Sequence, residues 1–167
     1  MTGSASYHSG DASPWEGEVL VADARLKSVE AGTESLVAGD IRLRSVAQTA
    51  ELHGRRRSSA AATSGNAFVL SPTLLALGGK EPATIEGRAD VSGYTLHLAG
   101  MVTSQRLLAL GTALPQLGDG LDDVVPANRT TTGAFHVDLV ANRPWGGTQV
   151  WRDASVNGGR GRRRARR

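Results

Sequence analysis

The stretch that decides the fold reads Ala83-Thr-Ile-Glu-Gly-Arg-Ala-Asp-Val91, then Ser92-Gly93, then Tyr94-Thr-Leu-His-Leu-Ala-Gly-Met-Val102. Small or apolar residues occupy every second position of both runs, and polar residues occupy most of the positions between them. This period of two is the signature of strands with one buried face. Ser92-Gly93 can form a two-residue turn, because glycine readily adopts a positive φ. The stretch therefore predicts a β-hairpin.

Other runs on both sides of the hairpin also have strand character. They are residues 18–26, 40–46, 67–70, 133–141 and 148–151. Residues 133–141 alternate strictly, with Phe135, Val137 and Leu139 on one face. Residues 67–70 are expected to end at a turn that Ser71-Pro72 opens.

One helix is expected after the hairpin. Thr103-Ser104 offers an N-cap, leucines recur at helical spacings over residues 107–114, and Pro115 ends the run. Strands that follow one another through short turns, with a single helix among them, indicate a mainly antiparallel β fold.

Composition limits the class of protein. The chain has 167 residues, 40% of them hydrophobic, and no cysteine. The apolar fraction excludes a wholly disordered chain, and the lack of cysteine excludes disulfides and thiolate sites. Residues 1–15, rich in Ser, Gly and Ala, predict a flexible leader with no recognisable targeting signal. Residues 16–152 predict the β-rich domain, and residues 153–167 predict a basic disordered tail.

The basic character of the chain is concentrated in that tail. Six of the 19 Lys and Arg residues lie in Arg160–Arg167, which leaves 13 basic residues against 16 acidic ones elsewhere. An arginine run of this kind could bind nucleic acid or another anionic surface without sequence preference. However, the body has no predicted basic face, and no aromatic residues are interleaved with the run. Nucleic-acid binding is therefore the alternative hypothesis, and a solvated tail is the simpler interpretation.

Polar residues with catalytic or ligand chemistry are scattered. His136 and Asp138 lie two apart on one predicted strand, so both face the same side. His97 lies opposite the apolar side of its strand, and Asp119-Gly-Leu-Asp-Asp123 gathers three carboxylates without the spacing of an EF-hand. Such patterns are typical of the solvated face of a strand or of a turn. We therefore expect no catalytic residue, no metal site and no cofactor.

Several segments between Phe68 and Trp151 combine small and apolar residues with glycines. They are Phe68–Gly79, Ala83–Gly87, Ser92–Gly100, Leu107–Gly111, Leu114–Leu121 and Arg143–Gly147. Together they resemble one repeat of the AsmA-like family of bacterial envelope proteins. The resemblance implies a curved, elongated β-groove in the periplasm, associated with the inner membrane. It also implies a role in outer-membrane assembly or phospholipid transport, without a covalent reaction.

The chain departs from that family pattern in two respects. It has no N-terminal anchoring helix, and it is far shorter than a protein that bridges an envelope. We therefore expect a C-terminal fragment whose groove continues into neighbouring repeats of a longer chain.

With this resemblance, the apolar face of the predicted sheet becomes the candidate lipid-facing surface. Its residues are Ile85, Val91, Leu96, Leu98, Phe135, Val137 and Leu139. Each methylene removed from water is worth about 0.8 kcal/mol, so an acyl chain needs no specific contact to bind. The alternative is that these side chains pack beneath the Leu107–Leu114 helix as a closed core. If the helix leaves the apolar side chains uncovered, we expect a phospholipid or a membrane surface as partner.

Overall fold

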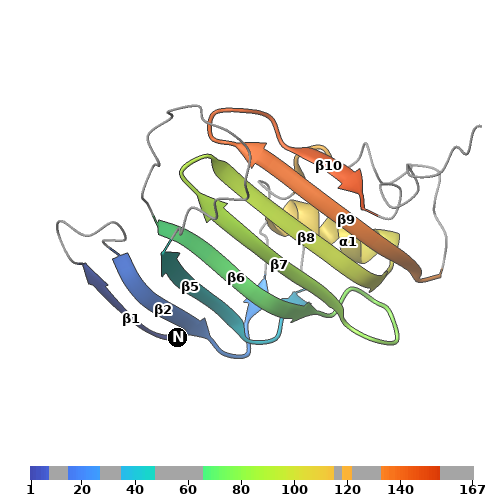
Figure 1. Cartoon of the computed structure of the whole chain (residues 1–167). Helices are drawn as coiled ribbons and strands as arrows, with labels where there is room; N and C mark the ends of the chain where they lie inside the picture. Colours follow the sequence, from blue (N-terminus) through green and yellow to red (C-terminus); the bar gives the residue numbers. More distant parts are fainter. Residues whose placement is uncertain (8–14, 27–34, 48–65, 115–117, 122–132, 155–167) are drawn as a thin grey trace, which may run out of the picture.

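The fold is one large antiparallel sheet with a single helix (Figure 1). The computed structural model describes residues 1–7, 15–26, 35–47, 66–114, 118–121 and 133–154. In spatial order, the strands of the 8-stranded sheet are β1 (Thr2–Tyr7), β2 (Trp15–Val21), β5 (Ile41–Ala47), β6 (Asn66–Leu75), β7 (Ala83–Asp90), β8 (Gly93–Val102), β9 (Phe135–Pro144) and β10 (Val150–Asp153). A small second sheet pairs β3 (Arg25–Leu26) with β4 (Leu36–Val37), and α1 spans Ser104–Ala113. The predicted mainly β, antiparallel fold with one short helix is confirmed, whereas its groove-like curvature stays a prediction.

The predicted β7–β8 hairpin forms, but its two-residue turn is Val91-Ser92, one residue earlier than the predicted Ser92-Gly93. Asp90 pairs with Gly93, whose φ is +153°, and the two strands then stay in register to Thr84 and Ala99. The turn is held by Ser92, which donates from its backbone N–H and its hydroxyl to Asp90 Oδ1 at 2.8 and 2.6 Å. Close sequence neighbours supply every one of these contacts, which is why the local pattern was sufficient.

The helix also begins where the sequence predicts. The Thr103 side chain accepts a hydrogen bond from the Arg106 N–H at 3.4 Å, and this contact satisfies one donor of the first turn. Leu107 and Leu110 are buried, whereas Leu108 between them is 46% exposed. The helix therefore presents one apolar stripe to the rest of the protein.

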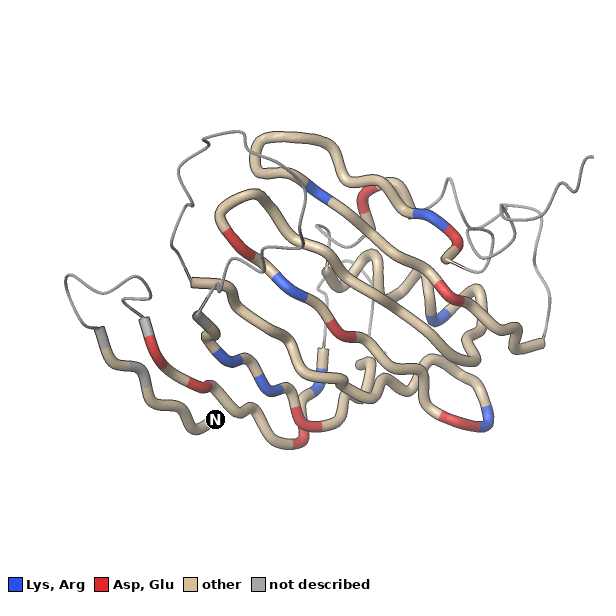
Figure 2. Tube along the Cα trace, in the orientation of Figure 1, with Lys and Arg blue, Asp and Glu red and all other residues tan. Residues whose placement is uncertain are grey.

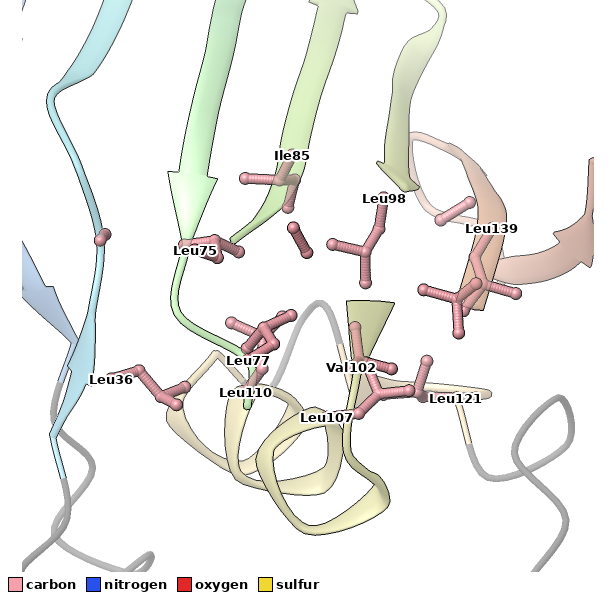
Figure 3. Close-up of a cluster of buried hydrophobic side chains, with 14 of the residues drawn as sticks. Leu36, Leu75, Leu77, Ile85, Leu98, Val102, Leu107, Leu110, Leu121 and Leu139 are labelled. Atoms are coloured by element: carbon pink, nitrogen blue, oxygen red, sulfur yellow. The ribbon is translucent and has the colours of Figure 1, made fainter. Parts of the chain in front are cut away.

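The core lies between α1 and one face of the sheet (Figure 3). Ile85, Leu98 and Leu139 pair directly across β7, β8 and β9, and we call the face that carries them the apolar face. The opposite face, called here the open face, carries Glu86, His97 and Asp138. The larger core residues are Leu36, Leu75, Leu77, Ile85, Leu98, Val102, Leu107, Leu110, Leu121, Val137, Leu139 and Trp151.

Two ends of the sheet can be distinguished. Helix α1 lies at the end where β6 and β8 finish and β7 and β9 begin, which we call the helix end (Figure 1). The other end holds the β7–β8 turn at Ser92, and we call it the turn end. The β3–β4 pair joins the core at the helix end, since Leu36 and Ala38 are buried and Ala38 bridges to Leu75.

Two sequence expectations are wrong in detail. Residues 2–7, expected in a loose leader, form β1 and pair with β2 over six positions. Small polar residues show no hydrophobic period, but an outermost strand needs only backbone hydrogen bonds to one neighbour.

The expected turn at Ser71-Pro72 is also absent, because β6 continues through it. Pro72 is accommodated at a β-bulge, where the β6–β7 register shifts between Leu70 and Thr73.

Residues 8–14 and 155–167 lie outside the described residues. They include about half of the predicted leader and nearly all of the predicted basic tail, with Arg160–Arg167 among it. The last described strand, β10, extends to Asp153, one residue past the predicted end of the domain.

Candidate functional site

Most of the predicted lipid-facing residues are brought together, but beneath α1. Ile85, Leu98, Val137 and Leu139 are 6%, 1%, 7% and 5% exposed. Leu96 and Phe135 are partly buried and pack against the same cluster. In this structure the central four are therefore core residues and not an open surface, as the closed-core alternative expects. The reason is that α1 returns directly onto the strands that precede it, since only Thr103 separates it from β8.

Val91 does not belong to the apolar face. β7 ends at Asp90, and Val91 lies in the turn with 57% of its surface exposed. The strand stops there because the Asp90 carboxylate accepts both hydrogen bonds from Ser92, and these bonds bend the chain back. The alternation in the sequence predicted a strand that runs to Val91, one residue past its actual end.

Helix α1 leaves part of the apolar face uncovered, on the β1–β6 side of the sheet. Val19 pairs with Leu43, and the next position of β5 on the same face, Ser45, pairs with Phe68. Leu43 is 38% exposed and Phe68 is 43% exposed. We call Val19, Leu43 and Phe68 the bare strip; with neighbouring residues of β1, β2 and β5 they line a hollow of about 80 Å³. Alternation in residues 40–46 already placed Leu43 on a strand face, but it could not show that α1 would leave this part of the face uncovered.

The bare strip is continuous with the core. Val21, Ile41 and Leu96 are partly buried and pack against the core cluster from the strip side. Gly87 leaves room for the Leu96 side chain to lie over β7, because a Cβ at position 87 would come within 2.6 Å of it. The apolar face therefore grades from closed core at the helix end to exposed side chains near the turn end.

The open face carries a cluster of charges across its three central strands. His97 of β8 lies between Asp138 of β9, at 2.7 Å from Nε2 to Oδ1, and Glu86 of β7, at 3.2 Å from Nδ1 to Oε1. The hydrogen bond to Asp138, and next the one to Glu86, raise the pKa of His97 against the opposing effect of partial burial. The protonated ring can donate to both carboxylates at once, so the cluster cross-links three strands.

This arrangement does not fit a metal site. Both ring nitrogens of His97 already face carboxylate oxygens, so neither nitrogen is directed at a shared vacant point. Within the described residues no group of three or more His, Asp or Glu side chains could hold a metal ion. His136, which lies two residues before Asp138 on the same strand, is exposed, and the partner of Asp138 is His97.

The carboxylate run after the helix is only partly described. Asp119 Oδ2 lies 3.8 Å from Arg143 Nη1, and the Asp119 carbonyl accepts from the Gln149 side chain at 3.0 Å. These contacts tie the segment after α1 to β9 and to the residue before β10. Asp122 and Asp123 lie outside the described residues.

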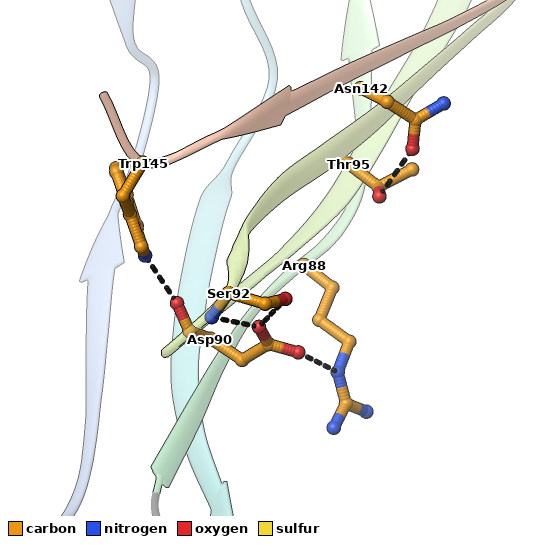
Figure 4. Close-up of polar contacts among 6 residues, drawn as sticks. All are labelled: Arg88, Asp90, Ser92, Thr95, Asn142 and Trp145. Atoms are coloured by element: carbon orange, nitrogen blue, oxygen red, sulfur yellow. Dashed lines mark hydrogen bonds and ion pairs between the residues drawn. The ribbon is translucent and has the colours of Figure 1, made fainter. Parts of the chain in front are cut away.

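Aromatic and polar side chains meet at the turn end (Figure 4). The Trp145 indole N–H donates to the Asp90 carbonyl at 2.6 Å, and the Trp145 ring meets Tyr94 edge-on with centroids 5.9 Å apart. The hydrogen bonds from Ser92 lower the pKa of Asp90, and Arg88 lies 3.9 Å from the same carboxylate. These contacts hold Trp145 in place although 58% of it is exposed.

The fold and the surfaces together define a mainly β protein, an open antiparallel sheet with an apolar face that its helix half covers. Acidic and basic residues are interspersed over the sheet without forming one charged field, with acidic residues on β2, basic residues on β5 and both kinds on β7 and β9 (Figure 2). Comparisons with protein-family models, with curated proteins and with solved structures find no significant match for this chain. No described helix has both the length and the apolar character needed to cross a bilayer.

Proposed function

We propose that this chain is a non-enzymatic module of the cell envelope, of the AsmA type, that shelters acyl chains on its apolar face. The observation that carries the proposal is the bare strip of Val19, Leu43 and Phe68. It is an exposed continuation of the core, on the face that the AsmA-like segments supply. The proposal places the protein in the periplasm, in outer-membrane assembly or phospholipid transport.

The strip has a suitable size for an acyl chain. Neighbouring strands lie about 4.8 Å apart, so β2, β5 and β6 together span roughly 10 Å, which is wide enough for an extended hydrocarbon chain to lie on the strip. Each buried methylene contributes about 0.8 kcal/mol, so half a dozen methylenes against the strip contribute about 5 kcal/mol. Micromolar binding corresponds to about 8 kcal/mol, so it needs contact with at least about ten methylenes, most of the length of an acyl chain. No hydrogen bond to the chain is required.

The proposal changes which residues touch lipid. The four buried residues Ile85, Leu98, Val137 and Leu139 support the strip from beneath α1, and they would meet an acyl chain only if the helix moved away. Leu96 lies at the boundary between the core and the strip. The contact residues are therefore those of β2, β5 and β6. Val19 and Leu43 lie upstream of the segments that resemble the family, whereas Phe68 begins the first of those segments.

The test is a comparison of matched variants. Protein purified from a bacterial host is extracted with organic solvent, and phospholipid is sought by mass spectrometry; binding of a fluorescent fatty acid is then measured in the absence of vesicles. Leu43→Asn and Phe68→Asn should weaken fatty-acid binding about 10-fold each, because each removes roughly 1.4 kcal/mol of apolar contact. Leu74→Asn is the control, since Leu74 is on β6, is 53% exposed and lies on the opposite face.

Two results would contradict the proposal. One is an absence of co-purifying lipid together with no saturable fatty-acid binding. The other is equal binding by Phe68→Asn and Leu74→Asn, which would mean that the apolar face is not the binding surface.

A further inference from the structure

Aromatic residues are concentrated at the turn end of the sheet. The chain has seven of them, three Trp, two Tyr and two Phe. Five stand at the strand ends and turns of this one end, namely Tyr7, Trp15, Phe68, Tyr94 and Trp145. The remaining two, Phe135 and Trp151, pack with the core. We call Phe68, Val91, Tyr94 and Trp145 the aromatic end.

The register places these positions in one row. Tyr7 pairs with Trp15 where β1 ends and β2 begins. Phe68 of β6 and Tyr94 of β8 both pair with Ala89 of β7, which lies between them. Trp145 follows the last residue of β9 and contacts Tyr94. In Figure 1 the corresponding ends of β1, β2, β5, β6, β7, β8 and β9 all lie along the same edge of the molecule.

The exposed side chains of this end are held in position before any partner arrives. Trp145 and Val91 are 58% and 57% exposed, and they lie in adjacent turns. The Trp145 N–H is bound to the Asp90 carbonyl (Figure 4), and the Tyr94 hydroxyl donates to Gln149, so internal contacts orient both rings. A partner would therefore meet rigid apolar rings with little further loss of side-chain entropy.

We propose that the aromatic end docks on the headgroup region of a phospholipid bilayer. Tryptophan and tyrosine concentrate at membrane–water interfaces, where an amphipathic ring bridges the apolar and aqueous phases. Phe68 belongs both to the aromatic end and to the bare strip, so the acyl surface opens at the place where the bilayer would lie. The inference rests on the proposed function for its choice of a lipid partner over a protein.

Charge contributes little to this contact. Arg88 lies beside Asp90 and Arg143 beside Asp119, so the arginines near the turns have acidic neighbours. Binding should therefore occur on zwitterionic membranes and should resist salt. Attraction of a membrane by the run Arg160–Arg167 would instead require anionic lipid and would be screened by salt.

The experiment is flotation of the full chain with phosphatidylcholine vesicles at about 0.1 M and about 1 M NaCl. We expect binding at both salt concentrations, and at least a 10-fold weaker partition for the double variant Val91→Ser/Trp145→Ser. Val91→Ser alone, which breaks no hydrogen bond, should weaken partition measurably. Val37→Ser is the matched control, because Val37 is 51% exposed but lies in β4 at the helix end.

Three outcomes would overturn the inference. They are no binding to phosphatidylcholine, equal partition of the Val91→Ser and Val37→Ser variants, and binding that disappears in high salt or on removal of residues 160–167. Loss of vesicle binding while vesicle-free fatty-acid binding persists would refute the docking surface alone, and would favour a protein partner for the aromatic end. The reverse result would refute only the proposed function.

Discussion

Truncation of Leu107 tests whether α1 is fixed on the apolar face. Leu107 is fully buried, and it packs in the cluster with Leu77, Val102 and Leu110 (Figure 3). Replacing such a leucine by alanine removes its transfer free energy and leaves a cavity, which together cost about 2–5 kcal/mol. Helix propensity does not offset this loss, since alanine and leucine are both strong helix formers.

The assay is thermal unfolding followed by circular dichroism. For a chain of this size about 1 kcal/mol shifts the melting temperature by roughly 2–4 °C, so a loss of about 3 kcal/mol predicts a decrease of roughly 6–12 °C. Leu108→Ala is the matched control: Leu108 is the next residue of α1 and is 46% exposed, and its truncation should change stability by about 0.5 kcal/mol or less. Equal losses in the two variants would refute the packing of α1 on the sheet, and with it the boundary between core and bare strip.

Two further predictions concern the open face and the sheet backbone. The raised pKa of His97 means that its stabilising contribution is complete below about pH 6.5, the unfolded value, and is lost as the pH rises through the folded value. The melting temperature of wild type should therefore fall towards that of His97→Gln as the pH is raised above about 6.5. Leu108→Ala, which leaves the His97 cluster intact, should instead keep a constant difference from wild type over the same range. Gly100 has a φ of +130°, and a Cβ there would come 2.8 Å from the Ala83 Cα. Gly100→Ala should therefore cost about 2 kcal/mol or more in denaturant unfolding, whereas Gly133→Ala, with no atom within 4 Å of the new methyl, should change stability by about 0.5 kcal/mol or less. A neutral Gly100→Ala would contradict the close approach of β7 and β8.

The parts of the fold that could be predicted from the sequence are those with local determinants. The two alternating runs predict the hairpin, with a turn that lies one residue before the predicted Ser92-Gly93, and Thr103 caps a helix of regularly spaced leucines. β1 could not be predicted, because its small residues carry no hydrophobic period and the strand forms through backbone pairing with β2. The extent of the bare strip depends on where α1 packs, which no spacing within residues 40–46 encodes.

The His97 cluster shows the same limit within one site. Once the turn pairs Asp90 with Gly93, the hairpin register places Glu86 opposite His97, so half of the cluster could have been derived from the sequence. Asp138 reaches His97 only after α1 and a long connection, and its register with β8 has no local signal. The sequence therefore grouped Asp138 with His136 on its own strand instead.

The two outermost strands differ in a way that matters at high protein concentration. β10 is four residues long and includes Arg152 and Asp153, features that discourage unwanted edge-to-edge pairing. β1 has no charged residue and no proline between Thr2 and Tyr7, and no strand of the described residues pairs with its outer edge, so its backbone groups there can template a foreign strand. Self-association should therefore proceed from one side of the molecule, and a lysine substituted into that outermost segment is the simplest remedy against ribbon-like aggregates.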